Sequence, residues 1–259
     1  MLFLLSPAKT LNFETRAPFK AQSTPPFVAE SAELINVLKT KTVADIAALM
    51  DLSDPLAALN VGRYGVWSPR FTARNSKPAV FAFNGDVYEG LSANTLTEAD
   101  VQWANQHLAI LSGLYGVLRP LDRMQAYRLE MGTALENAAG KNLYAFWGDK
   151  LALHLNHRVK ADASPVIVNL ASQEYFKAAD RKALKPRVIE CVFEDWKTDG
   201  YKVISFFAKR ARGLMARFAI EQRLVTPSGL QDFNAEGYVF EAAHSQANRL
   251  VFRRRVQVD

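Results

Sequence analysis

Short blocks of apolar residues along the chain predict strands and helices that follow one another in turn. Brief apolar runs ended by polar or turn residues predict three short buried strands, at Leu2 to Leu5, Ala79 to Phe83 and Pro165 to Leu170. Arg187 to Trp196 and Tyr201 to Phe207 are also strand-like, and the intervening Lys197-Thr198-Asp199-Gly200 predicts an antiparallel hairpin between them. A last strand is expected at Arg249 to Val256.

Helices are predicted where a capping residue precedes Ala and Leu at helical spacing. Three such starts are Thr42 with Asp45, Asp54 with Pro55, and Thr97 with Asp100. Gly148 to Arg158 and Ala208 to Leu224 show the same periodicity. Helices interleaved with strands, together with a hairpin, predict a single α+β domain over residues 1–259, with a mixed sheet and surrounding helices.

Composition places the chain among ordinary globular proteins of a reducing compartment. It is 49% hydrophobic and 22% charged, and its one cysteine, Cys191, can build neither a disulfide framework nor a thiolate metal site. The apolar start stops at Ser6-Pro7 without a preceding basic residue, so we expect no signal peptide, no membrane span and a cytoplasmic location. A net charge of +6 favours polyanionic partners.

Polar residues directly follow each of the three short predicted strands. Lys9 comes after the first, Asn84 and Asp86 after the second, and Glu174 after the third. If the strands are parallel neighbours, these side chains meet at one rim of the sheet, where open α/β sheets hold ligands. A lysine near carboxylates can act as nucleophile or electrostatic clamp, and an aspartate as general base. The alternative is separate turn and cap chemistry at each position.

A second candidate segment is Leu111 to Arg123, which holds two glycines around an apolar bend followed by arginines. Backbone N–H groups at Gly113 and Gly116 could approach a phosphate between two helices, with Arg119 and Arg123 beside them. The alternative is a glycine C-cap followed by an ordinary loop.

A basic helix face is the third candidate. At about 100° per residue, Lys209, Arg210, Arg212 and Arg217 gather on one side of a helix, with apolar residues opposite. Acidic residues are absent until Glu221, which leaves phosphate contact and a merely solvated basic face as equal alternatives.

Metal and cofactor sites are not expected. His154 and His157 lie three residues apart on a predicted helix, but no further His or Glu occupies a matching position. The chain also lacks a Walker-type loop, a Gly-x-Gly-x-x-Gly after a strand and a Gly-x-Ser-x-Gly elbow, which disfavours common nucleotide hydrolases and serine esterases.

Several motifs taken together closely resemble the YaaA peroxide-stress family over essentially the whole chain. They are Ser6-Pro7-Ala8-Lys9, Asn84-Gly85-Asp86-Val87-Tyr88, Ser112 to Gly132 ending in Tyr127-Arg128-Leu129-Glu130-Met131-Gly132, Phe146-Trp147-Gly148, Asn169-Leu170-Ala171-Ser172, and Lys209-Arg210-Ala211-Arg212-Gly213 with Met215-Ala216-Arg217-Phe218.

The resemblance implies the cantaloupe fold with a basic cleft and a helix-hairpin-helix element, which would fall on Ser112 to Leu118. It also implies binding to duplex and junction DNA, resistance to hydrogen peroxide and lower free intracellular iron. The favoured hypothesis is sequence-nonspecific DNA binding, without a cofactor, that protects DNA or helps its repair, with Arg128 among the phosphate contacts. The alternative is an enzyme acting on damaged DNA or a nucleobase through Lys9, Asp86 and Glu174.

Overall fold

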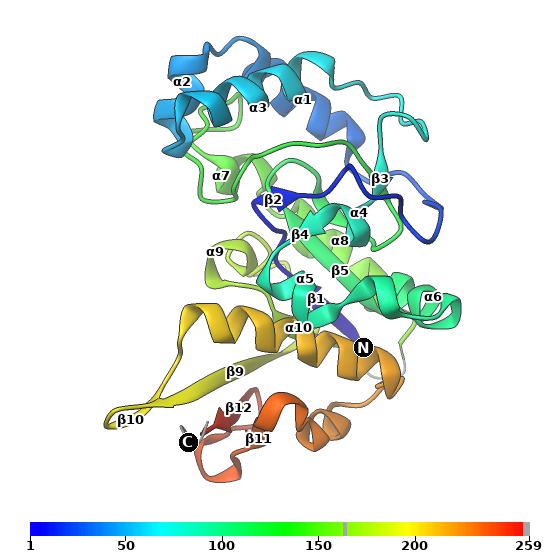
Figure 1. The fold of residues 1–259 in the computed structure, drawn as a ribbon, viewed down its shortest axis with the longest axis vertical. Coiled ribbons are helices and arrows are strands. Elements are labelled where there is room, and N and C mark those ends of the chain that lie inside the picture. Colours follow the sequence, from blue (N-terminus) through cyan, green and yellow to red (C-terminus); the bar gives the residue numbers. More distant parts are fainter. Residues whose placement is uncertain (163–164, 256–259) are drawn as a thin grey trace.

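The computed structural model of the protein describes residues 1–162 and 165–255. An eight-stranded sheet runs through the molecule (Figure 1). Its strands, in spatial order, are β11 (Val239–Phe240), β12 (Arg249–Arg254), β9 (Arg187–Lys197), β8 (Val166–Leu170), β1 (Leu2–Leu5), β5 (Leu108–Ser112) and β6 (Gly116–Leu118), with β10 (Gly200–Lys202) paired to β9. The predicted mixed sheet with surrounding helices is confirmed.

The centre of the sheet is parallel and buried on both faces. β1 pairs in parallel with β8 on one side and with β5 on the other, so that Phe3 lies beside both Val168 and Leu108. Every residue of β1, β5 and β8 is buried. This double burial explains why these strands appear in the sequence as continuous apolar runs rather than alternating ones. The strands predicted at Leu2 to Leu5 and Pro165 to Leu170 are therefore confirmed.

Ten α-helices in the described chain pack around the sheet and beside it (Figure 1). They are α1 (Val28–Lys39), α2 (Val43–Met50), α3 (Asp54–Val66), α4 (Ala79–Ala82), α5 (Asp86–Leu91), α6 (Glu98–His107), α7 (Leu143–Trp147), α8 (Lys150–Val159), α9 (Gln173–Phe176) and α10 (Ser205–Glu221). Short 3-10 turns occupy Ala93–Thr95, Pro227–Asp232, Ala235–Gly237 and Ala242–His244. None of the helices in the described chain has both the length and the apolar character that crossing a bilayer requires.

The three predicted helix starts are confirmed, two of them by their caps, whereas α3 begins at Asp54 itself and its N-cap Ser53 makes no side-chain hydrogen bond. Thr42 before α2 and Thr97 before α6 each form a complete capping box with the aspartate three residues later. Pro55 lies at the start of α3. Each box satisfies two backbone donors that the first helical turn would otherwise leave free.

Two predicted strands are wrong in whole or in part. Ala79–Ala82 forms the helical turn α4, and only its end joins β4 (Phe83–Asn84). The backbone N–H groups of Ala79 and Val80 donate to the carbonyls of Asp122 and Pro120. The prediction failed because a buried apolar run this short shows no periodicity that would distinguish a strand from a helix. The strand predicted at Tyr201 to Phe207 ends with β10, because α10 begins three residues later.

Two further small sheets and the last strand complete the chain. β2 (Thr10–Leu11) pairs with β4, and β3 (Lys77–Pro78) pairs with β7 (Arg123–Met124), both antiparallel. The strand predicted at Arg249 to Val256 is confirmed as β12, which pairs in parallel with β9, while Val256 lies outside the described residues.

The segment from Ser112 to Leu118 is a buried β-hairpin joining β5 to β6. Gly116 has a φ of +66°, which glycine adopts readily in a tight turn. A side chain at Gly113 would overlap the carbonyl of Leu129, so this backbone is packed against protein and not turned to solvent. The helix-hairpin-helix predicted for this segment is therefore wrong, because its apolar residues fill the sheet core instead of two helices.

Helices α5 and α10 cross at two glycines (Figure 1). An added Cβ at Gly213 would overlap the carbonyl oxygen of Val87, and one at Gly90 would overlap the carbonyl oxygen of Arg210. The two backbones are therefore in direct contact. This crossing sets α10 close to Asp86, the first residue of α5.

We expect Gly213→Ala to lower the free energy of unfolding by about 1–3 kcal/mol, because the new methyl group has no space between the two helices. Gly62→Ala is the matched control, since Gly62 lies inside α3 with no atom within 4 Å of its missing Cβ. That change should leave stability unchanged or raise it by up to about 1 kcal/mol. Urea unfolding of both variants checks the contrast, and equal effects would contradict the close crossing.

Candidate functional site

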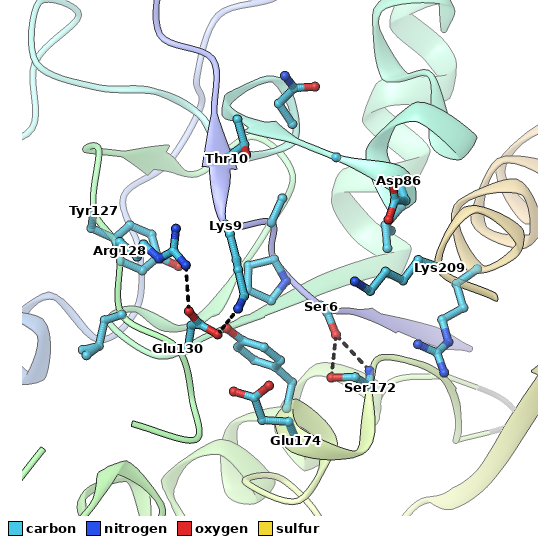
Figure 2. A pocket seen from close by; sticks show the side chains of 18 residues that line it. Ser6, Lys9, Thr10, Asp86, Tyr127, Arg128, Glu130, Ser172, Glu174 and Lys209 are labelled. Atoms are coloured by element: carbon cyan, nitrogen blue, oxygen red, sulfur yellow. Dashed lines mark hydrogen bonds and ion pairs between the residues drawn. The ribbon is translucent and has the colours of Figure 1, made fainter. Parts of the chain in front are cut away.

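A cavity of about 490 Å³ opens where several polar strand ends and α10 meet (Figure 2). Its walls come from the loop after β1, the turn between β4 and α5, the segment after β7, the start of α9 and the second turn of α10. Lys9, Asn84, Asp86 and Glu174 all line it. The predicted convergence of these side chains at one rim is confirmed as geometry, while their roles remain proposals.

The floor of this site cavity is built from the ends of two parallel strands. Ser6 follows β1 and Ser172 follows β8, and the parallel pairing of these strands brings both residues to one edge of the sheet. The backbone N–H of Ser172 donates to Ser6 Oγ at 2.8 Å, and Ser6 Oγ donates to Ser172 Oγ at 3.3 Å. Tyr88 donates from its hydroxyl to the Ser6 carbonyl at 3.0 Å, which ties α5 to the same edge.

Asp86 and Asn84 are placed at the cavity by a small two-stranded sheet, and not by a strand of the main sheet as predicted. The segment before them is no neighbour of β1 in the main sheet, but β4 pairs with β2, with Asn84 opposite Thr10. Because Thr10 follows Lys9 directly, this short pairing brings the polar turn at Asn84 to Asp86 beside the loop after β1.

Lys9 and Arg128 share one carboxylate (Figure 2). Glu130 lies 2.7 Å from Lys9 Nζ through one oxygen and 3.2 Å from an Arg128 nitrogen through the other. The Lys9 side chain is 63% exposed, whereas that of Arg128 is 14% exposed. Sequence reasoning misses Glu130, because it belongs to no helix or strand pattern and only its place in the segment Tyr127 to Gly132 marks it.

Glu174 is fixed by the backbone of the opposite wall. Its Oε1 accepts a hydrogen bond from the N–H of Gly132 at 2.8 Å, and a Cβ at Gly132 would lie 3.2 Å from the same oxygen. Tyr127 and Tyr175 also line the cavity, and burial raises the pKa of both phenols, so they stay neutral near pH 7.

Two cations of α10, Lys209 and Arg212, complete the lining. Lys209 is exposed and Arg212 is partly buried. Burial lowers the pKa of the Arg212 guanidinium, while the neighbouring Glu190 and Cys191 act in the opposite direction. Within the described part of the chain, neither cation lies within 4 Å of a carboxylate oxygen.

The remaining residues of the predicted basic helix face point elsewhere. Arg210 pairs with Glu236 through two nitrogens, and Arg217 pairs with Glu221 at 2.8 Å. Arg217 also donates to the carbonyls of Leu91 and Ser92. These two arginines hold α10 against neighbouring segments and do not line the cavity.

The other predicted DNA contacts are scattered. Arg119 borders a smaller cavity of about 120 Å³ with Asp122 and His154, and Arg123 lies in β7. Gly113 and Gly116 are buried in the β5–β6 hairpin. Of the predicted set, only Arg128, Lys209 and Arg212 come together at the site cavity.

Metal binding has no grouped set of ligands in the described residues. Among residues 1–162 and 165–255, no three His, Cys, Asp or Glu side chains are grouped to hold a metal ion. The site cavity instead combines carboxylates with cations, and its carboxylates Glu130 and Glu174 already have protein donors. Such a mixture suits a polar organic ligand that carries both donors and acceptors.

Comparisons with known proteins match nearly the full length. The sequence profile of the family described as "Peroxide stress protein YaaA" matches residues 1–244. The chain is 63% identical over 256 residues to a "UPF0246 protein" of Paracidovorax citrulli, covering 98% of this chain and 99% of that relative. It is 64% identical over 254 residues to a "UPF0246 protein" of Polaromonas naphthalenivorans, covering 98% of each. Every residue that lines the site cavity falls inside the matched region.

Substitutions of Glu130 and of its exposed partner Lys9 should differ in their effect on the free energy of unfolding. Glu130→Gln leaves the mostly buried Arg128 without its counter-charge, so the free energy of unfolding should fall by about 1–3 kcal/mol. Lys9→Ala removes only an exposed partner and should cost less than about 1 kcal/mol. Urea unfolding of both variants tests this, and a larger loss for Lys9→Ala would mean that Lys9 serves mainly the fold.

Proposed function

Because the chain belongs to the peroxide stress protein YaaA family, we propose that it works in the response to hydrogen peroxide as an enzyme. Its substrate class would be damaged DNA or a nucleobase, and its active site the site cavity with Lys9, Asn84, Asp86 and Glu174. The observation that carries this proposal is the meeting of these side chains in one cavity of about 490 Å³, a size typical of small-molecule sites.

The charge pattern supports catalysis more than a plain phosphate track. The cavity is lined by Asp86, Glu130 and Glu174 as well as by four cations, Lys9, Arg128, Lys209 and Arg212. A surface that only binds phosphates needs no carboxylates, which would repel the ligand. The sequence alone favours DNA binding without catalysis. The carboxylates that share the cavity with the cations favour catalysis instead.

Each candidate has a chemical role that follows from its contacts. Asp86 forms no ion pair within the described chain and begins α5 at the cavity wall, which suits a general base. Lys9 is held by Glu130 and supplies a positioned positive charge. Glu174, fixed by Gly132, supplies a carboxylate of set orientation toward a donor on the substrate.

Asp86→Asn should lower turnover by about 100-fold or more while DNA binding is kept or slightly strengthened, because the change removes the proton acceptor and one negative charge and keeps the shape. Product formation is measured on duplexes that contain oxidised, uracil or abasic sites, alongside survival of cells in peroxide. Asp199→Asn is the control, since Asp199 lies in the β9–β10 turn with a side chain 74% exposed. Full turnover and survival with Asp86→Asn would exclude Asp86 as the base.

A second candidate function is sequence-nonspecific binding to duplex and junction DNA in the cytoplasm. The observation that favours it is the net charge of +6, with Arg128, Lys209 and Arg212 gathered at one opening. We further propose that any effect on free iron is indirect, since the described residues provide no grouped metal ligands.

DNA affinity should then fall with salt, and Lys209→Ala should flatten the slope by about one contact for every sequence tested. Arg210→Ala should change the slope less, because Glu236 already neutralises that guanidinium. Fluorescence anisotropy of labelled duplexes across a range of salt concentrations measures both. Parent-like binding by Lys209→Ala at every salt concentration would contradict DNA binding at the cavity opening.

A further inference from the structure

Helix α10 brings two cations to the site cavity that form no ion pair with any acidic residue in the described part of the chain. Lys209 and Arg212 lie one turn apart and both line the cavity. The other arginines of the same helix are satisfied, Arg210 by Glu236 and Arg217 by Glu221. Within residues 1–162 and 165–255, Lys209 and Arg212 are therefore the cations of α10 whose charge is left for a ligand.

The position of Arg212 favours an anion more strongly than an exposed arginine would. The Arg212 side chain is partly buried, and Glu190, whose negative charge acts on it, forms no ion pair with it. A partly desolvated charge without a direct ion-pair partner is less favourable in a folded protein than a paired one, and a bound anion reduces that penalty. Guanidinium groups also present paired donors that match phosphate oxygens.

The hydroxyl of Ser172 lines the floor of the same cavity as these cations. Ser6 Oγ accepts from the Ser172 N–H and donates to Ser172 Oγ, so the Ser172 hydroxyl keeps its own proton free to donate. Figure 2 shows the Lys209 side chain directed toward the region between Asp86 and Ser6. An ammonium, a guanidinium and a hydroxyl together form a donor set typical of phosphate sites.

The two ends of the cavity differ in charge. At one end Glu130 pairs with both Lys9 and Arg128, and Glu174 lies on the same side, so that two carboxylates balance two cations. At the other end Asp86 lies on the same side as Lys209, and Arg212 lines the cavity one turn further along α10, which gives a formal excess of one positive charge. That excess suits a single phosphate group and disfavours a diphosphate or triphosphate, whose further charges Asp86 would repel.

We propose that Lys209 and Arg212, with the Ser172 hydroxyl, form the phosphate subsite of the cavity, and that the ligand is a nucleotide with one phosphate. The base and sugar then lie toward Lys9 and Glu130. The phosphate comes either from a free nucleoside monophosphate or from a nucleotide unit within a DNA strand. This inference rests on the proposed function, because it takes the same cavity as the functional site.

Calorimetric titration of the full chain tests the subsite with three probes, namely deoxynucleosides, deoxynucleoside 5′-monophosphates and a short single-stranded oligonucleotide. The monophosphates should bind about tenfold or more tightly than the matching nucleosides, and Lys209→Ala and Arg212→Ala should each abolish that advantage without changing nucleoside affinity. Lys202→Ala, which removes an exposed lysine on β10, is the charge-matched control and should bind like the parent protein.

The outcomes show whether the phosphate belongs to a free nucleotide or to DNA, and whether the subsite exists. Binding of the oligonucleotide alone, with the same loss in both variants, assigns the subsite to a phosphate within DNA. Equal affinity for nucleosides and nucleotides, an advantage that survives both substitutions, or no binding of any probe overturns the subsite. Thermal unfolding confirms that both variants fold. The proposed enzyme function fails separately, if the parent protein forms no product from any of the duplexes with oxidised, uracil or abasic sites.

Discussion

The contact between the backbones of α5 and α10 fixes the site cavity. At Gly90 and Gly213 the two helices approach until carbonyl oxygens fill the space of the missing side chains. α10 also lies against β9, β8 and β1, so the crossing sets the distance between the sheet and the wall that carries Lys209 and Arg212. Packed interiors transmit such a change of separation instead of absorbing it. The site needs charged side chains both from α10 and from the segments at the sheet edge, so its geometry depends on the contact between α5 and α10.

The polar ends of parallel strands are the part of the site that a sequence can predict. Strands of this kind are almost entirely apolar, so the polar residues at and after their ends stand out in the sequence, and parallel pairing gathers them at one edge. Ser6 and Ser172 meet for that reason. Asp86 meets them although α4 replaces its predicted strand, because the β2–β4 pairing supplies another route to the same edge.

Partners distant in sequence are the part that local patterns cannot supply. The basic face of α10 appears free of acids when only neighbouring residues are counted, yet Glu236 from a later turn pairs with Arg210. Glu130 likewise reaches Lys9 across most of the first half of the chain. The glycines of the β5–β6 hairpin were equally ambiguous, since a glycine bend between apolar runs suits a hairpin as well as a helix connection.

The place of β1 in the sheet has a consequence for how the chain folds. β1 lies between β5 and β8, whose residues are made much later in synthesis. Until Leu170 has been added, Leu2 to Leu5 remains a wholly apolar segment with at least one edge unpaired, which is a target for chaperones and for aggregation. Because the central pairings join segments so far apart, we expect slow folding in which the cavity floor is among the last features to form.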